Sequence, residues 1–267
     1  FVRHDGQLAK AGGRVVKNVA GYDLMKLMSG SFGTLGILTQ LTWRTFPQQE
    51  VAQTAVLTGS AAAIQAVTAD VLKSSLTPAK LDILSPGLGT DGGNLFGLAV
   101  QFQSIAAGVA EQIELLTAIA QPYELQLQTR ADETDETFWQ ELTAALLPVE
   151  RTADLAIAKV GILPAQAVDL LESLETALAP GTWRARIHAS SGIGILQLHC
   201  PQNSPAQLAT VRSRCQAASG YLNLLEAPPD WQQQFDPWAL DDAARLMMTR
   251  LQKQFDPQGR LSPGRMR

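Results

Sequence analysis

Three glycines recur at a spacing of three residues in the stretch Gly-Ser-Phe-Gly-Thr-Leu-Gly, which runs from Gly30 to Gly36. Glycine has no Cβ, so its backbone N–H group can approach a ligand closely and its φ angle can be positive. The run therefore suits a loop that holds a cofactor through main-chain groups. An equally good interpretation is a tight turn between a helix and a strand that requires small residues.

Two common nucleotide-binding loops are excluded for this glycine run. Its spacing is GxxGxxG and a strand is predicted after it, whereas the dinucleotide fingerprint is GxGxxG and opens a helix. A phosphate-binding P-loop would need Gly-Lys-Ser or Gly-Lys-Thr, which the sequence lacks.

Side chains that could do chemistry are few. The chain has three histidines, His4, His188 and His199, and two cysteines, Cys200 and Cys215. None of them has the spacing of a metal-ligand set, so we predict no metal site and leave the catalytic residues unassigned. His188 is interpreted either as a hydrogen-bonded histidine of a sheet or as a side chain that faces a cofactor or keeps a vestigial role toward a substrate. Cys215 belongs to an apolar series at helical spacing, which predicts core packing.

The composition is that of a compact globular protein. Hydrophobic residues make up 46% and charged residues 17% of the 267 residues, whereas about a quarter of residues are charged in typical domains. The net charge of −4 argues against nucleic-acid binding. No apolar run reaches the roughly 18 residues that would predict a transmembrane helix. We expect a cytoplasmic protein, or one that reaches a membrane only within a complex.

Hydrophobic periodicity predicts two rounds of strand, helix, strand, strand, helix and strand. The first round is expected at 51–58, 61–73, 80–84, 95–102, 105–120 and 123–128. A helix follows at 135–146, and the second round is expected at 153–163, 165–178, 183–189, 193–198, 205–218 and 221–226. Such rounds predict an α+β fold with a ferredoxin-like antiparallel sheet covered by helices on one face.

The two ends of the chain have a different pattern. Residues 1–47 predict a strand at 13–19, a short helix at 22–28 and an extended run at 35–46. A last helix is expected at 237–255, where Asp236 can cap it, and a turn-forming tail follows. We therefore divide the chain into residues 1–47, 48–235 and 236–267.

Two signatures, one near each end, resemble a known family. The segment Lys-Asn-Val-Ala-Gly-Tyr-Asp-Leu begins at Lys17 and leads into the glycine run, and the tail reads Asp-Pro-Gln-Gly-Arg-Leu-Ser-Pro-Gly-Arg from Asp256. Both are similar to segments of the vanillyl-alcohol-oxidase or PCMH-type FAD-linked oxidases. The first segment is similar in particular to the FAD-binding subunits of glycolate oxidases and dehydrogenases (GlcE type).

This resemblance implies a role for each part of the chain. Residues 1–47 would be the second part of an FAD-binding domain, 48–235 a ferredoxin-like cap domain, and 236–267 a helix and tail that return to the FAD-binding domain. The first lobe of that domain, with its pyrophosphate loop, would lie outside this sequence. This chain is therefore not expected to be active alone.

The resemblance also implies a cofactor, partners and a reaction. FAD would take a hydride from a small 2-hydroxyacid such as glycolate, and electrons would pass to a catalytic flavoprotein subunit and an iron–sulfur subunit. The residues implied to line the FAD are Asn18, Gly21, Tyr22, Gly30, Ser31, Gly33, Thr34, Gly36, Ile37 and Arg265. The guanidinium of Arg265 would stabilise the reduced flavin, or else be a solvated cation near the chain end.

A second function, from a different class, is also open. The chain would then be a non-catalytic module for subunit assembly with a degenerate flavin site. His188 and Ala189 are similar to the start of a His-Ala-Gly-Asp-Gly-Asn-Leu-His segment in catalytic subunits, but Ile195 stands where the second histidine would be. Substrate oxidation on this chain is not supported by that comparison.

Overall fold

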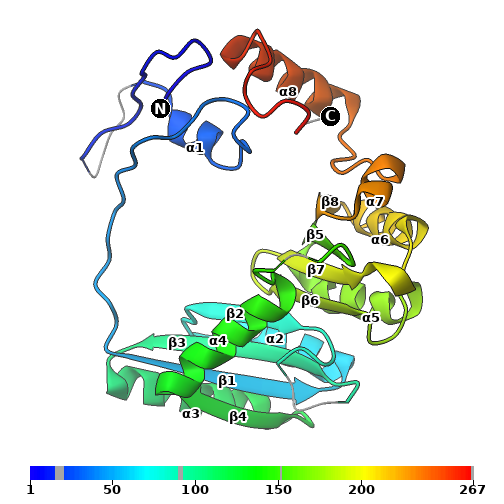
Figure 1. The fold of residues 1–267 in the computed structure, drawn as a ribbon. Coiled ribbons are helices and arrows are strands. Elements are labelled where there is room, and N and C mark those ends of the chain that lie inside the picture. The colour runs from blue at the N-terminus through cyan, green and yellow to red at the C-terminus, as the bar shows by residue number, and fades with distance from the viewer. Residues whose placement is uncertain (16–20, 90–92, 151, 266–267) are drawn as a thin grey trace. The chain divides into compact units, whose positions relative to one another are not determined.

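The computed structural model describes residues 1–15, 21–89, 93–150 and 152–265 (Figure 1). The predicted Asn18 falls outside these residues. The chain forms two compact units, one made of residues 1–47 with 240–267 and the other of residues 48–239. We call them the small unit and the sheet unit.

The sheet unit is built on eight strands in the spatial order β4-β1-β3-β2-β6-β7-β5-β8. Every neighbouring pair is antiparallel, which confirms the predicted antiparallel sheet. Each predicted round supplies four adjacent strands, and the rounds meet where β2 pairs with β6. The strands are β1 (Val51–Gly59), β2 (Lys80–Leu84), β3 (Phe96–Ser104), β4 (Gln126–Ala131), β5 (Leu155–Gly161), β6 (Trp183–His188), β7 (Ile193–His199) and β8 (Tyr221–Glu226).

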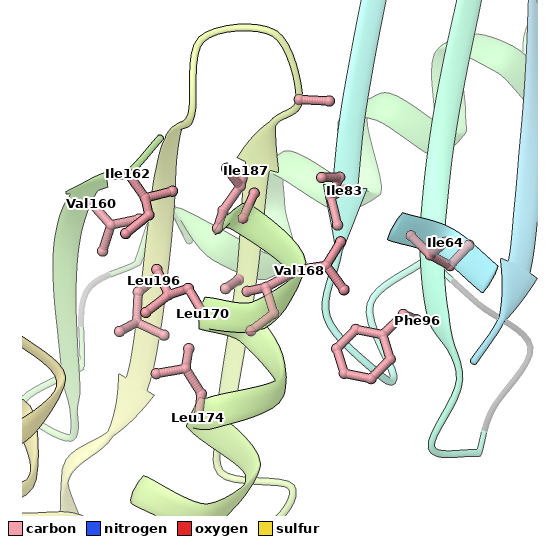
Figure 2. Close-up of a cluster of buried hydrophobic side chains, with 14 of the residues drawn as sticks. Ile64, Ile83, Phe96, Val160, Ile162, Val168, Leu170, Leu174, Ile187 and Leu196 are labelled. Atoms are coloured by element: carbon pink, nitrogen blue, oxygen red, sulfur yellow. The ribbon is translucent and has the colours of Figure 1, made fainter. Parts of the chain in front are cut away.

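One face of the sheet is covered by four helices that bury the main hydrophobic core. These are α2 (Ala61–Lys73), α3 (Ala106–Ala120), α5 (Ala167–Ala177) and α6 (Pro205–Ala217). The sheet unit also has a short helix, α7 (Pro229–Gln234), and 3₁₀ turns at Pro164–Gln166 and Cys200–Gln202. Val168, Leu170 and Leu174 of α5 lie among the side chains of this core (Figure 2). Two of the helices begin at serine caps: Ser60 accepts from the Ala63 N–H and Ser204 from the Gln207 N–H, as helix starts prefer.

The prediction that helices cover only one face is wrong. Helix α4 (Asp132–Leu146) packs on the opposite face and forms a second apolar cluster with sheet side chains such as Val56, Leu84 and Ala99. The physical reason lies in α4 itself, because Phe138, Trp139, Leu142 and Leu146 make one side of it apolar and must be buried.

The small unit has little regular structure. It contains α1 (Leu24–Met28) and α8 (Asp242–Phe255), together with isolated bridges that pair Val2 with Leu8 and with Ile37. Among the described residues the predicted strand at 13–19 is not formed over 13–15, and residues 38–46 are extended without strand partners. The predicted cap of the last helix is also wrong. The helix starts five residues later, and the side chain of Asp241 accepts from the Ala244 N–H at 2.7 Å.

Candidate functional site

The glycine run adopts a conformation that depends on glycine. The φ angles of Gly30 and Gly33 are +77° and +73°, in the left-handed region that residues with a Cβ avoid. Phe32 between them has a φ of +53°, which is rare for a bulky residue. The turn is closed by Thr34, whose N–H and hydroxyl both donate to the carbonyl of Ser31, at 3.0 and 2.7 Å.

The third glycine makes room for the start of the chain. Ile37 and Val2 exchange two backbone hydrogen bonds, of 2.8 and 3.0 Å. A Cβ on Gly36 would lie 3.0 Å from the ring of Phe1 and 3.3 Å from the carbonyl oxygen of Val2. Because it has no Cβ, Gly36 allows this close pairing with the first residues of the chain.

The tail is folded by the carboxylate of Asp256. This side chain is buried and accepts from the Leu261 N–H at 2.6 Å, while its backbone carbonyl accepts from the Gly259 N–H at 3.2 Å. Burial by itself raises the pKa of Asp256, but N–H groups led by those of Leu261 and Arg260, with His4 nearby, bring it below its ordinary value. The carboxylate thus stays charged and holds the turn that buries Leu261.

The glycine run and the tail meet at one hollow within the small unit. The hollow has a volume of about 410 Å³, at the lower end of the range of roughly 300–1,000 Å³ that ligand pockets occupy. A Cβ on Gly33 would lie 2.9 Å from the hydroxyl of Ser262, so the two segments touch there. The guanidinium of Arg265 lies over the ring of Phe32, 5.2 Å from its centroid. The lining residues are Met28, Gly30, Ser31, Phe32, Gly33, Gly36, Ile37, Leu38, Arg260, Leu261 and Ser262.

Several of the predicted site residues line this hollow and others lie beside it. Gly30, Ser31, Gly33, Gly36 and Ile37 are in its wall. Thr34 is buried and does not line the hollow, and Arg265 contacts its wall through Phe32. Gly21 and Tyr22 do not line it, and the side chain of Tyr22 is 94% exposed.

Sequence reasoning did not name Met28, Phe32, Leu38, Arg260, Leu261 and Ser262 as lining residues. Phe32 and Leu38 adjoin the glycine run, so proximity in sequence was a usable signal for them. Ser262 and Arg260 reach the hollow only because the tail folds onto the run, which no local pattern encodes.

The chemistry of the hollow suits part of a flavin nucleotide. Glycines leave the main chain open to a ligand, and Met28, Ile37 and Leu261 offer apolar contact to a flat ring. Arg260 also lines the hollow, and its guanidinium, one nitrogen of which donates to the His4 carbonyl at 3.3 Å, brings a positive charge suited to a phosphate. The residues present therefore fit one side of such a cofactor.

Metal-binding and membrane-spanning features are absent from the described parts of the chain. No group of three histidine, cysteine or acidic residues there could hold a metal ion. None of the helices found there has both the length and the apolar character that crossing a bilayer requires.

Sequence comparisons give partial matches. No family model matches the chain. Over 82 residues it is 39% identical to glycolate oxidase subunit GlcD of Bacillus subtilis (strain 168), which covers 30% of this chain and 17% of that protein. Over 43 residues it is 51% identical to glycolate oxidase subunit GlcE of Escherichia coli (strain K12), and the match covers 16% of this chain and 12% of that protein. A D-lactate dehydrogenase of Archaeoglobus fulgidus is 48% identical over 44 residues, 16% of this chain and 10% of that protein.

Comparison of structures covers nearly the whole chain. Alkyldihydroxyacetonephosphate synthase superimposes with a TM-score of 0.59 at 12% identity, over 94% of this chain and 50% of that one. Glucooligosaccharide oxidase from Acremonium strictum superimposes with a TM-score of 0.52 at 10% identity, over 86% of this chain and 58% of that one. That protein has a 6-S-cysteinyl, 8α-N1-histidyl FAD. These likenesses show a shared fold. The chain therefore shares its fold with these two proteins and short stretches of sequence with glycolate oxidase subunits, and it spans about half the length of the two structures.

Proposed function

We propose that this chain is the C-terminal part of the FAD-binding subunit of a glycolate or related 2-hydroxyacid oxidoreductase. One observation carries the proposal. The glycine run that follows the first signature and the tail that forms the second lie more than 200 positions apart in the sequence, yet both line one hollow. A glycine-rich turn with no ligand would not require the tail to fold against it.

The residues of the hollow would have separate tasks. Gly30 and Gly33 would present main-chain groups to the cofactor, and Arg260 and Arg265 would offset its negative charge. When bound, the flavin would supply the capacity to accept a hydride from the substrate. Gly21 and Tyr22 would contact the part of the cofactor that the hollow does not cover.

The remainder of the assignment follows from the relatives. We propose that the sheet unit is a ferredoxin-like cap domain, because each round has the strand order 4-1-3-2. Since relatives are named as glycolate oxidase subunits, we propose a catalytic flavoprotein subunit and an iron–sulfur subunit as partners. The first lobe of the flavin-binding domain would be supplied by sequence beyond this chain, and activity would require it.

The test is a titration of FAD into the purified chain, followed by flavin fluorescence. With one wall of the site present, we expect saturable but weak binding, with a Kd on the order of 100 μM. A dissociation constant below about 1 μM would show that the site is complete without a further lobe. Riboflavin, which lacks phosphate, should bind more weakly than FAD because it cannot use Arg260.

A matched pair of glycine variants makes the test specific. Gly33→Ala places a Cβ against Ser262 and should abolish the fluorescence change. Gly6→Ala is the control, because Gly6 also has a positive φ, +82°, but a Cβ there meets nothing within 4 Å. If neither the unaltered protein nor the control binds FAD at any concentration, the flavin assignment fails and the chain is an assembly module.

A further inference from the structure

The strand β4 forms one edge of the sheet unit. In the order β4-β1-β3-β2-β6-β7-β5-β8, its strand neighbour in the described part of the chain is β1 (Figure 1). The opposite edge differs, because the Leu224 N–H of β8 donates to the carbonyl of Pro237 at 2.8 Å, so a later segment of the chain lies along it. An edge strand presents main-chain donors and acceptors with which a strand of another molecule can pair.

Two leucines at this edge are only partly covered. Leu127 is opposite Leu57 of β1, which belongs to the main core, so Leu127 lies on the core face of the sheet. Leu125, just before β4, also packs against that core, and both leucines are only partly buried. A second strand beside β4 would cover the sides that the chain leaves open, which is favourable for apolar groups.

The same edge carries one cation and one anion. Arg130 of β4 lies over the ring of Phe138 on α4, 5.0 Å from its centroid. The Nε of Arg130 is buried and has no hydrogen-bond partner among the residues that the structure describes. A buried guanidinium nitrogen in this state gains from a nearby carboxylate. Glu124 is exposed and precedes β4 by two residues.

These residues make the edge complementary to itself. Two antiparallel copies of one strand are related by a twofold axis, so the residue on that axis fixes every other pair. With Leu127 on the axis, Arg130 of each copy is level with Glu124 of the other, because they follow and precede Leu127 by three positions. With residue 128 on the axis, Glu124 would instead be level with Asp132, and like charges opposite each other are unfavourable.

We propose that β4 is the contact surface for a second copy of this chain, in an antiparallel dimer whose two sheets join edge to edge. Leu127 lies on the twofold axis, and Arg130 of each copy pairs with Glu124 of the other. Since the strand is short, we expect a weak dimer with a dissociation constant on the order of 10 μM. The proposal is independent of the proposed function, because no residue of the hollow takes part.

The experiment is analytical ultracentrifugation of the 267-residue chain at concentrations from about 1 to about 200 μM, on both sides of the expected dissociation constant. The mass should rise from 28.7 kDa toward twice that value. A chain that stays monomeric throughout would overturn the proposal and leave the edge to a different protein or to solvent.

Charge reversal tests the pairing of Arg130 with Glu124. Glu124→Arg makes two cations level with each other and should raise the dissociation constant of the dimer at least about tenfold. The double variant Glu124→Arg with Arg130→Glu restores opposite charges in exchanged order, so most of that loss should be recovered. Glu172→Arg, an exposed change of the same kind on α5, should leave the dimer unchanged. Equal weakening by Glu172→Arg, or a folded double variant that stays as weak as Glu124→Arg, would refute the pairing.

Cysteine variants test the register without changing a charge, and they decide the question if the double variant does not fold. Leu127→Cys places two thiols opposite each other on the axis, within reach of a disulfide. In Thr129→Cys the two thiols are offset by four residues, about 13 Å along the strands, which is too far. The native thiols of Cys200 and Cys215 are buried, so mild oxidation should cross-link Leu127→Cys alone. Cross-linking of both variants, of neither, or of Thr129→Cys alone would overturn the proposed dimer.

Discussion

At the scale of single residues, burial sets the behaviour of the two thiols. Burial raises the pKa of Cys200 to about 11, with a smaller contribution from Asp154. Burial also raises the pKa of Cys215 to about 11, although its own backbone and Arg212 oppose this. Both thiols are therefore neutral at physiological pH, and a neutral thiol is a poor nucleophile.

We predict that stability falls as the pH rises from about 9 to about 11. In that window the thiols of the unfolded chain, which have ordinary pKa values, release their protons, while the thiols of the folded chain retain them. The unfolded state is therefore stabilised relative to the folded state as the pH rises. Urea unfolding at about pH 8 and about pH 10.5, on either side of the ordinary thiol pKa, measures the change. Cys215→Ala should reduce the pH dependence, and an unchanged dependence in that variant would refute the buried thiol as its cause. Neither thiol should react with a thiol reagent near neutral pH before unfolding.

Asp135 adds buried hydrogen bonds to the apolar packing of α4 on the sheet. Its buried carboxylate accepts from the hydroxyl of Thr54 and, at 2.6 Å, from the side-chain amide of Gln101. The Thr54 oxygen in turn accepts from the Trp139 ring N–H at 2.8 Å. Removing the carboxylate leaves buried donors without an acceptor.

We predict that Asp135→Leu lowers the free energy of unfolding by roughly 1–3 kcal/mol, measured by urea titration. Glu133→Leu is the control, because Glu133 is exposed in the same helical turn, and it should cost no more than about 1 kcal/mol. Equal losses in the two variants would mean that Asp135 acts only through the helix dipole.

Some of the residues that line the hollow could be picked out from the sequence because their conformation has a local cause. The three glycines were recognisable because glycine is the residue that tolerates a positive φ, and Gly30 and Gly33 have that conformation. The placement of Arg265 over Phe32 and the capture of the tail by Asp256 depend on contacts between distant segments. Their residue types are compatible with many other arrangements, so no pattern in the sequence specified them.

At the scale of elements, α8 shows how one side chain sets a boundary. Asp236 accepts from the Trp238 N–H at 2.9 Å in a preceding turn, whereas Asp241 caps the helix. Both are Asp residues before an apolar stripe, so spacing alone favoured the earlier one. We predict that Asp241→Ala frays the first turn of α8 at a cost of about 0.5–2 kcal/mol. Hydrogen exchange at the Ala244 amide measures this.

Asp236→Ala is the matched control for α8 and should leave that exchange rate unchanged. Faster exchange at Ala244 in the Asp236 variant, and not in the Asp241 variant, would contradict the assigned cap.

The elements of the sheet unit were more predictable than their arrangement. The helix at 61–73 and the strands at 80–84 and 221–226 have the predicted bounds, because alternation and 3.6-residue periodicity are strong there. The side of the sheet taken by α4 was not predictable, because periodicity shows that a helix has an apolar face but not which surface covers it.

At the scale of the whole molecule, the two units differ in how they are stabilised. The sheet unit contains both large apolar clusters, whereas α8 has no buried residue and Trp43 and Phe46 are 77% and 73% exposed. Residues 37–50 are all exposed and have almost no regular structure. Such segments are cut readily by proteases.

We predict that brief treatment with trypsin cuts first within 1–47, with Arg44 as the main site, and leaves a resistant fragment that contains the whole sheet. Mass spectrometry of the products identifies the cuts. Arg44→Gln should remove the main product. Early cleavage at Lys159, within β5, would contradict the stability assigned to the sheet unit.

The junction of β2 with β6 has a consequence for any attempt to divide this protein. The two rounds are joined by a short ladder of three residue pairs, from Asp82 with His188 to Leu84 with Arg186. A shortened chain that ended after α4 would expose the free backbone groups of β2 along an apolar strand. Such an edge is a template for pairing between molecules, so the shortened protein would form edge-to-edge dimers or precipitate. In the intact chain β6 pairs with β2, so this edge is covered and is not open to pairing between molecules.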